Sequence, residues 1–160
     1  MGAREVILLD GGTGTELRER GVEVPCHRTS IWSARALDEA PDEGVAGHRE
    51  YIDAGARVVT ACNYAVTPIL LAREGMAHRV EELSVLAVDL ARRAREESGV
   101  DVRIAASLPP LDTSYRADLV APDAELRAEY SRLAGILAPR VDVLLCETLS
   151  LSREAVVAVE

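Results

Sequence analysis

Four short runs of apolar residues recur along the chain. They span residues 6–9, 58–62, 102–106 and 141–146. None of them shows the alternation of apolar and polar residues that marks a strand with one solvent-exposed face. Continuous runs of this length are typical of strands in a parallel sheet that is covered on both faces. The pattern therefore predicts four buried parallel strands.

Between these runs, apolar positions recur with the spacing of a helix face. The predicted helices span residues 43–54, 80–97, 123–137 and a last segment that runs to residue 160. Gly55 and Gly99 follow two of them as helix stops. Pro122 is expected in the first turn of the third helix, and Ser150 or Ser152 is expected to cap the fourth.

The predicted order is four strands that alternate with four helices, which calls for an α/β fold with a parallel sheet. Two architectures fit this order, an open doubly wound sheet and a (β/α)8 barrel, of which four units are half. The sequence shows no linker or low-complexity segment, so residues 1–160 are predicted to belong to one domain.

Composition excludes several classes of protein. The net charge is -9 and no cluster of Lys and Arg stands against it, so a nucleic-acid-binding surface is not expected. No apolar run approaches the roughly 20 residues that span a membrane. The three cysteines, Cys26, Cys62 and Cys146, are widely spaced and odd in number, which argues against a disulfide framework and favours a reducing, cytoplasmic location.

Polar and small residues follow the carboxyl end of every predicted strand. Because these ends share one rim in both architectures, we expect them to meet around a ligand. Two carboxylates at such a rim can hold an α-amino group. The candidate substrate-binding residues are Asp10, Gly11, Gly12, Tyr64, Ser107, Glu147 and Thr148.

Plainer interpretations of these residues stay open. Asp10 and the two glycines after it could form an ordinary turn, and Tyr64 could simply pack at the rim. Glu147 could cap the next helix or pair with an arginine. A phosphate loop at residues 12–14 is disfavoured, because the Gly-Lys-Ser/Thr ending is missing.

The histidines and cysteines do not show the spacing of a metal site. His48 and His78 are expected on solvated helix faces. Neighbouring strand residues face opposite sides, so if Glu147 faces the rim, Cys146 faces the helices. Cys62 and Cys146 are therefore predicted to be buried, inert thiols rather than zinc ligands.

Four segments resemble, in order, the motifs of the homocysteine S-methyltransferase family. They are "ILLDGGTGTELRERG" at 7–21, "HREYIDAGARVVTACNYA" at 48–65, "AASLPPL" at 105–111 and "VDVLLCETLSLSREAVVAVE" at 141–160. The resemblance implies the N-terminal half of a (β/α)8 barrel, a partial barrel domain over residues 1–160 whose C-terminal half is absent. It implies transfer of a methyl group from a donor such as S-methylmethionine, a betaine or a methylated cofactor to the thiol of homocysteine, giving methionine.

The resemblance also assigns roles to residues. Asp10 and Glu147 match acidic residues that hold the amino group of the substrate, and Gly11 and Gly12 let the backbone approach it. In the family, three cysteines that come late in the fold hold zinc. The Gly-Gly-Cys-Cys type of segment is absent here, so the metal ligands are expected outside this chain and no metal site within it.

Half a barrel leaves two sheet edges open, which promotes self-association or pairing with a C-terminal half. Because the zinc-ligand cysteines of the family are missing, the chain alone is expected to be inactive in methyl transfer. A non-catalytic protein that still binds an amino acid, or an interaction remnant of this fold, is the alternative.

Overall fold

The computed structural model describes residues 6–23 and 31–160, without the side chains of Trp32 and Ser33. Three strands, β1 (Val58–Thr60), β2 (Arg103–Leu108) and β3 (Val143–Cys146), form one sheet in the order β1-β2-β3. Both pairings are parallel, with Val58 opposite Arg103 and Ala105 opposite Val143. The prediction of an α/β fold with a parallel sheet is confirmed.

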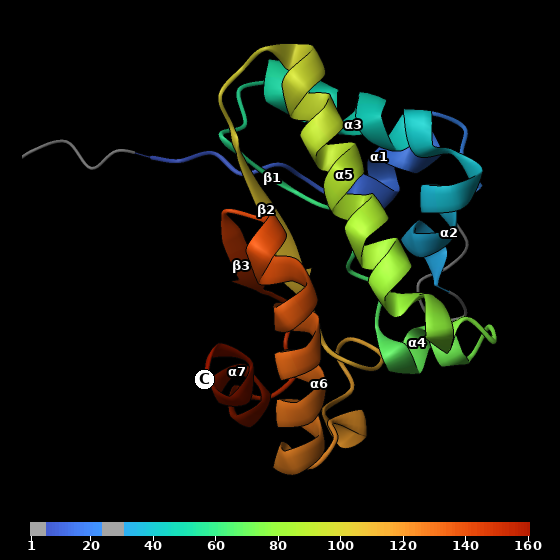
Figure 1. Cartoon of the computed structure of the whole chain (residues 1–160), viewed down its shortest axis with the longest axis vertical. Helices are drawn as coiled ribbons and strands as arrows, with labels where there is room; N and C mark the ends of the chain where they lie inside the picture. The colour runs from blue at the N-terminus through green and yellow to red at the C-terminus, as the bar shows by residue number, and fades with distance from the viewer. Residues whose placement is uncertain (1–5, 24–30) are drawn as a thin grey trace, which may run out of the picture.

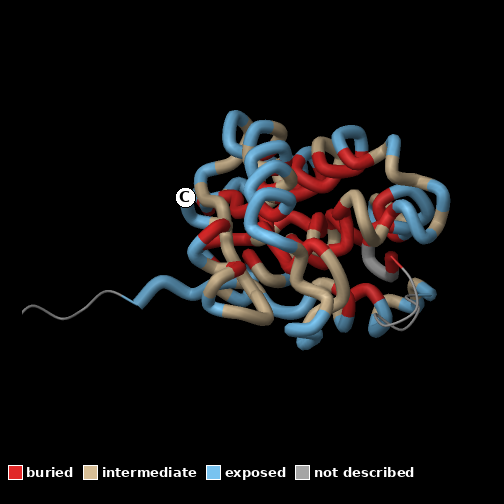
Figure 2. The backbone as a smooth tube through the Cα atoms, turned by 90° about the horizontal axis from the view of Figure 1, so that it is seen from below, coloured by how far each residue is buried: buried red, intermediate tan, exposed pale blue. Residues whose placement is uncertain are grey.

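The apolar run at residues 6–9 is not a full strand, and in this respect the prediction is wrong. It makes a single parallel bridge, from Leu9 to Val58. The run lies at the sheet edge beside β1, and β1 has only three residues with which a neighbouring strand can pair. Leu9 and Val6 are 45% and 87% exposed, and the exposed N-terminal segment is seen in Figure 2.

All four predicted helices are present within two residues of the predicted bounds, and three short helices were not predicted. The structure has α1 (Thr13–Glu19), α2 (Trp32–Glu39), α3 (Pro41–Asp53), α4 (Pro68–Ala72), α5 (Val80–Ser98), α6 (Asp123–Leu137) and α7 (Ser152–Val159). Short 3-10 turns lie at Ala77–Arg79, Ala117–Leu119 and Ala138–Arg140. The unpredicted helices α1, α2 and α4 have five to eight residues each, too few for a helical period to stand out.

Two predicted helix starts are corrected. Pro122 is the N-cap of α6 rather than a residue of its first turn. The N-cap of α7 is Leu151, and neither Ser150 nor Ser152 caps the helix with its side chain. Instead, the carboxylate of Glu154 in the first turn accepts the backbone N–H of Ser150 at 2.7 Å, which ties the helix to the residue before its N-cap.

Helices α3, α5, α6 and α7 form a row in which each packs against the next, and they cover the sheet (Figure 1). The central strand β2 is buried along all but its first residue. Every residue of β3 is half-buried, as befits an edge strand. The core lies between sheet and helices and includes Val59, Leu83, Ile104, Leu126 and Leu133.

The histidines differ from each other. His78 is exposed, as predicted. His48, on α3, is 1% exposed, so its predicted solvation is wrong: a helix packed against both α1 and α5 has little surface left for solvent. Cys26 lies outside the described residues. No helix within the described ranges is both long enough and apolar enough to cross a bilayer.

The end of α5 depends on the left-handed backbone of Gly99, which has a φ of 67° and donates its N–H to Arg95 at 3.1 Å. No atom lies within 4 Å of where a Cβ would be, so Gly99→Ala should cost only the conformational strain, about 1–2 kcal/mol of unfolding free energy. Gly135→Ala, in the open interior of α6, should stabilise by about 0.5–1 kcal/mol. Denaturant titration measures both, and equal shifts of the same sign would contradict this reasoning.

Candidate functional site

A cavity of about 530 Å³ opens at the carboxyl ends of the strands. The lining includes all seven residues that the sequence nominated, namely Asp10, Gly11, Gly12, Tyr64, Ser107, Glu147 and Thr148. Residues from four separate stretches of the chain thus meet at one cavity, as expected for the carboxyl ends of parallel strands. Their role in binding a substrate stays a prediction.

Asp10 is anchored to the end of β1. Its carboxylate accepts the backbone N–H of Thr60 at 2.7 Å and the Thr60 hydroxyl at 3.0 Å. Burial raises the pKa of Asp10, the two bonds from Thr60 oppose the rise, and the negative charge of Glu147 adds to it. The two carboxylates are therefore close enough to interact, and a cation placed between them would relieve their repulsion.

Glu147 directly follows β3, and its carboxylate accepts a hydrogen bond from the hydroxyl of Ser107 on β2. Ser107 is held in turn by Asn63. The Asn63 side chain donates to the Ser107 carbonyl and accepts the Ser107 N–H, both at 2.9 Å. Because β1 ends at Thr60, this side-chain amide replaces the peptide group that a longer β1 would present to β2.

Asn63 is a supporting residue that the sequence pattern does not single out. A polar residue directly after an apolar strand was the available signal, but nothing in the sequence shows that its amide faces the neighbouring strand. Asn63 is 2% exposed. It does not line the cavity, and it contributes by holding Ser107, which does.

Backbone strain is concentrated at this cavity. Among the described residues, the non-glycine residues with positive φ are Tyr115 at 62° and Thr148 at 58°, and both line the cavity. A β-branched residue such as Thr148 rarely adopts this conformation. Strained residues of this kind gather where a side chain must be held in a particular place for function.

Tyr64 connects the loops around the cavity. Its hydroxyl lies 2.6 Å from that of Ser114, and it also hydrogen-bonds to Thr148. Burial raises the pKa of Tyr64, and these two hydroxyls oppose the rise. The ring is thus fixed in the wall with its polar end already engaged.

The two glycines after Asp10 have different surroundings. A Cβ on Gly11 would lie 2.9 Å from the ring of Tyr51, on α3. Gly11 is therefore needed first for the packing of Tyr51, which adds a reason that the resemblance did not supply. Gly12 is the N-cap of α1, and only the side chain of Thr15 lies near its missing Cβ.

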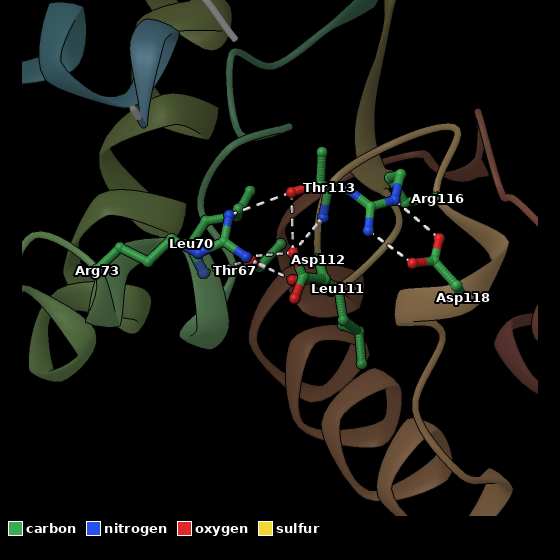
Figure 3. Close-up of polar contacts among 8 residues, drawn as sticks. All are labelled: Thr67, Leu70, Arg73, Leu111, Asp112, Thr113, Arg116 and Asp118. Carbon is green, nitrogen blue, oxygen red and sulfur yellow. Dashed lines mark hydrogen bonds and ion pairs between the residues drawn. The ribbon is translucent and has the colours of Figure 1, made fainter. Parts of the chain in front are cut away.

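The loop between β2 and α6 forms one wall that the sequence analysis did not anticipate. Asp112, Thr113, Ser114 and Tyr115 all line the cavity. Arg73 at the end of α4 forms an ion pair with Asp112 and donates to Thr113 at 3.2 Å (Figure 3). No apolar period or motif marks this loop, so only the fold shows that it reaches the cavity.

The two cysteines that the structure describes, Cys62 and Cys146, have different surroundings. Cys62 is buried and lines the cavity, whereas the thiol of Cys146 donates to the Ala158 carbonyl of α7 at 3.8 Å. The predicted orientation of Cys146 toward the helices is confirmed, and burial raises the pKa of its thiol. Residues 6–23 and 31–160 contain no cluster of three His, Cys, Asp or Glu side chains that could hold a metal ion, so these residues alone do not fit the metal that the resemblance implies.

Comparisons with known proteins agree with this geometry. The profile of the family described as "Homocysteine S-methyltransferase" matches residues 7–160. Homocysteine S-methyltransferase of Escherichia coli is 31% identical over 91% of this chain and 51% of its own length. YbgG of Bacillus subtilis, also a homocysteine S-methyltransferase, is 30% identical over 94% of this chain and 52% of its own length.

A solved structure is similar over nearly the whole chain. The metallated form of the homocysteine methyltransferase MmuM from Escherichia coli has a TM-score of 0.85 and 29% identity, covering 97% of this chain and 58% of that one. The chain thus spans about half the length of the relatives it matches. The profile, the relatives and the shared fold together show that the chain belongs to the homocysteine S-methyltransferase family.

Proposed function

We propose that this chain forms the amino-acid-binding part of a site that transfers a methyl group to the thiol of homocysteine. The observation that carries the proposal is the pair of carboxylates, Asp10 and Glu147, on one cavity whose described lining contains no Lys, Arg or His. An α-amino group is the part of an amino acid that such a pair would hold.

Each residue has a limited task in this proposal. Asp10 and Glu147 accept hydrogen bonds from the ammonium group and so set the position of the rest of the substrate. Thr60 and Ser107 keep the two carboxylates in place through the bonds described above. Tyr64 and Thr148 complete the wall. Homocysteine then loses its thiol proton to solvent, and its sulfur forms a bond to the methyl carbon of the donor. The bond between that carbon and the donor atom breaks, and its electron pair stays on the donor.

We further propose that the sheet is one half of a (β/α)8 barrel and that residues 1–160 make up that half. The row of helices outside a parallel sheet and the half-exposed β3 support this arrangement. A C-terminal half would extend the sheet from β3. Thiol activation then requires residues beyond those described, and the chain alone is expected to show no methyl transfer.

Calorimetric titration of the full chain with L-homocysteine under reducing conditions tests the binding proposal. We expect the wild type to bind and Glu147→Gln or Asp10→Asn to bind about 10- to 100-fold more weakly, because a hydrogen bond to a charged group contributes roughly 1.5–3 kcal/mol.

The matched control is Glu82→Gln, which removes a carboxylate that pairs with Arg79 on the surface of α5. It should leave the affinity for homocysteine unchanged. Wild-type affinity in both cavity variants, or equal losses in the control, would refute the proposed role of the carboxylate pair.

A further inference from the structure

Two buried polar side chains, Tyr130 on α6 and Glu154 on α7, have no task in the function proposed above and do not line the cavity. Tyr130 is 3% exposed, and Glu154, at 1%, is the most deeply buried acidic side chain among the described residues. Taking a carboxylate out of water is costly unless hydrogen bonds replace those to water. The partners of this buried pair therefore indicate what its burial achieves.

The buried pair belongs to a chain of hydrogen bonds where α6 packs against α7 (Figure 1). The Tyr130 hydroxyl donates to the Pro109 carbonyl at 3.0 Å and to the Glu154 carboxylate at 3.3 Å. The other carboxylate oxygen of Glu154 accepts the backbone N–H of Ser150 at 2.7 Å. Burial raises the pKa of Tyr130, and the negative charge of Glu154 adds to the rise, so the phenol keeps its proton and remains a donor.

Both ends of this hydrogen-bond chain lie close in sequence to residues of the cavity. Pro109 comes two positions after Ser107, and Ser150 comes three positions after Glu147. The Ser107 hydroxyl donates to the Glu147 carboxylate inside the cavity. The buried pair is therefore a second link between the ends of β2 and β3, made outside the cavity.

The backbone connection between these two strand ends is weak. The Glu147 N–H donates to the Leu108 carbonyl at 3.4 Å, beyond the usual range of about 2.7–3.2 Å. The next residue, Thr148, has the strained φ of 58°, and such a residue keeps its conformation only where its surroundings hold it. The segment that carries Glu147 thus depends on other contacts, and the buried pair supplies one at Ser150.

We propose that Tyr130 and Glu154 are positioning residues that hold the carboxylate of Glu147 in place for the substrate. This inference rests on the proposed function and deepens it, because it names what fixes one of the two carboxylates. A group that binds a ligand has to be kept close to its productive position by packing and by hydrogen bonds from residues behind it. The buried pair acts on the strand ends and touches no ligand.

Calorimetric titration of the full chain with L-homocysteine tests the inference. Tyr130→Phe and Glu154→Ala should bind about 3- to 10-fold more weakly than the wild type, because a carboxylate that is held loosely loses part of its bond to the ammonium group. Glu154→Gln should bind as the wild type does. Its amide accepts the Ser150 N–H and donates to the Tyr130 hydroxyl, so the link stays intact without the charge.

A double-mutant comparison separates positioning from a general loss of stability. In a Glu147→Ala background, Tyr130→Phe should change the affinity less than twofold, because the group that it positions is gone. The matched control is Ser98→Ala, which removes the acceptor of the Val100 N–H before the amino end of β2. It should lower the urea midpoint and leave the affinity unchanged. An equal loss of affinity in both backgrounds, or the same loss in the control, would overturn the inference.

Amide hydrogen exchange in the free chain measures the positioning without a ligand. The Glu147 N–H should exchange at least about threefold faster in Tyr130→Phe and Glu154→Ala, and at the wild-type rate in Glu154→Gln and Ser98→Ala. A wild type that does not bind homocysteine would refute the proposed function alone, since exchange at Glu147 still reports on the buried pair. An unchanged exchange rate at Glu147 in Tyr130→Phe would contradict the positioning role, whether or not homocysteine binds.

Discussion

Replacing Asn63 by leucine is expected to lower the free energy of unfolding by about 2–6 kcal/mol. The substitution leaves the buried N–H and carbonyl of Ser107 without their partners at the end of β1. Each buried backbone group left unpaired costs roughly 1–3 kcal/mol. Urea titration followed by circular dichroism measures the loss.

Two further variants make this result specific. Asn63→Asp keeps an acceptor for the Ser107 N–H but loses the donor to its carbonyl, so it should also be destabilised. Ser84→Ala removes a fully buried hydroxyl that has no hydrogen-bond partner among the described residues, so it should not lower the free energy of unfolding. An Asn63→Leu protein as stable as Ser84→Ala would show that the amide is dispensable.

The second large effect is expected from the buried His48 as pH falls. Burial lowers the pKa of His48 from 6.5 to about 4. Between these values the unfolded chain binds a proton that the native state does not, so the free energy of unfolding decreases with falling pH. The slope approaches about 1.4 kcal/mol per pH unit, and the loss across the range is about 3 kcal/mol.

The variant His48→Leu should remove this part of the pH dependence. Neither ring nitrogen of His48 has a hydrogen-bond partner among the described residues, so the variant should be at least as stable as the wild type at pH 7. His78→Gln, at an exposed position, is the matched control and should keep the wild-type slope. Parallel stability curves for wild type and His48→Leu from pH 7 to 4.5 would contradict the assignment.

Much of the fold follows from local patterns, and the exceptions have physical causes. The period of α6 predicts Asp123–Leu137 without error, because a long helix repeats its signal several times. The run at 6–9 has an equally clear apolar signal, but strand formation depends on a partner, and the sequence does not show that β1 has only three residues.

The site is predictable where residues lie at, or a few positions after, the carboxyl end of an apolar run. Asp10 and Glu147, which each follow an apolar run directly, line the cavity as expected. Tyr115 comes from a long loop whose course is set by distant contacts, such as the Arg73–Asp112 pair. The burial of His48 differs from the prediction because a polar residue on a helix suggests exposure to solvent, and the local pattern does not show that α3 packs against α1 and α5.

The parallel register also has a consequence for how quickly the chain reaches its native state. Val58 pairs with Arg103, and Ala105 with Val143, so each ladder joins segments separated by at least one whole helix. Such non-local pairings require loop closure before they return any favourable energy, which slows the crossing of the barrier. Helices such as α5 acquire structure from near neighbours in microseconds or less, and the rate of the whole process is therefore set by the sheet.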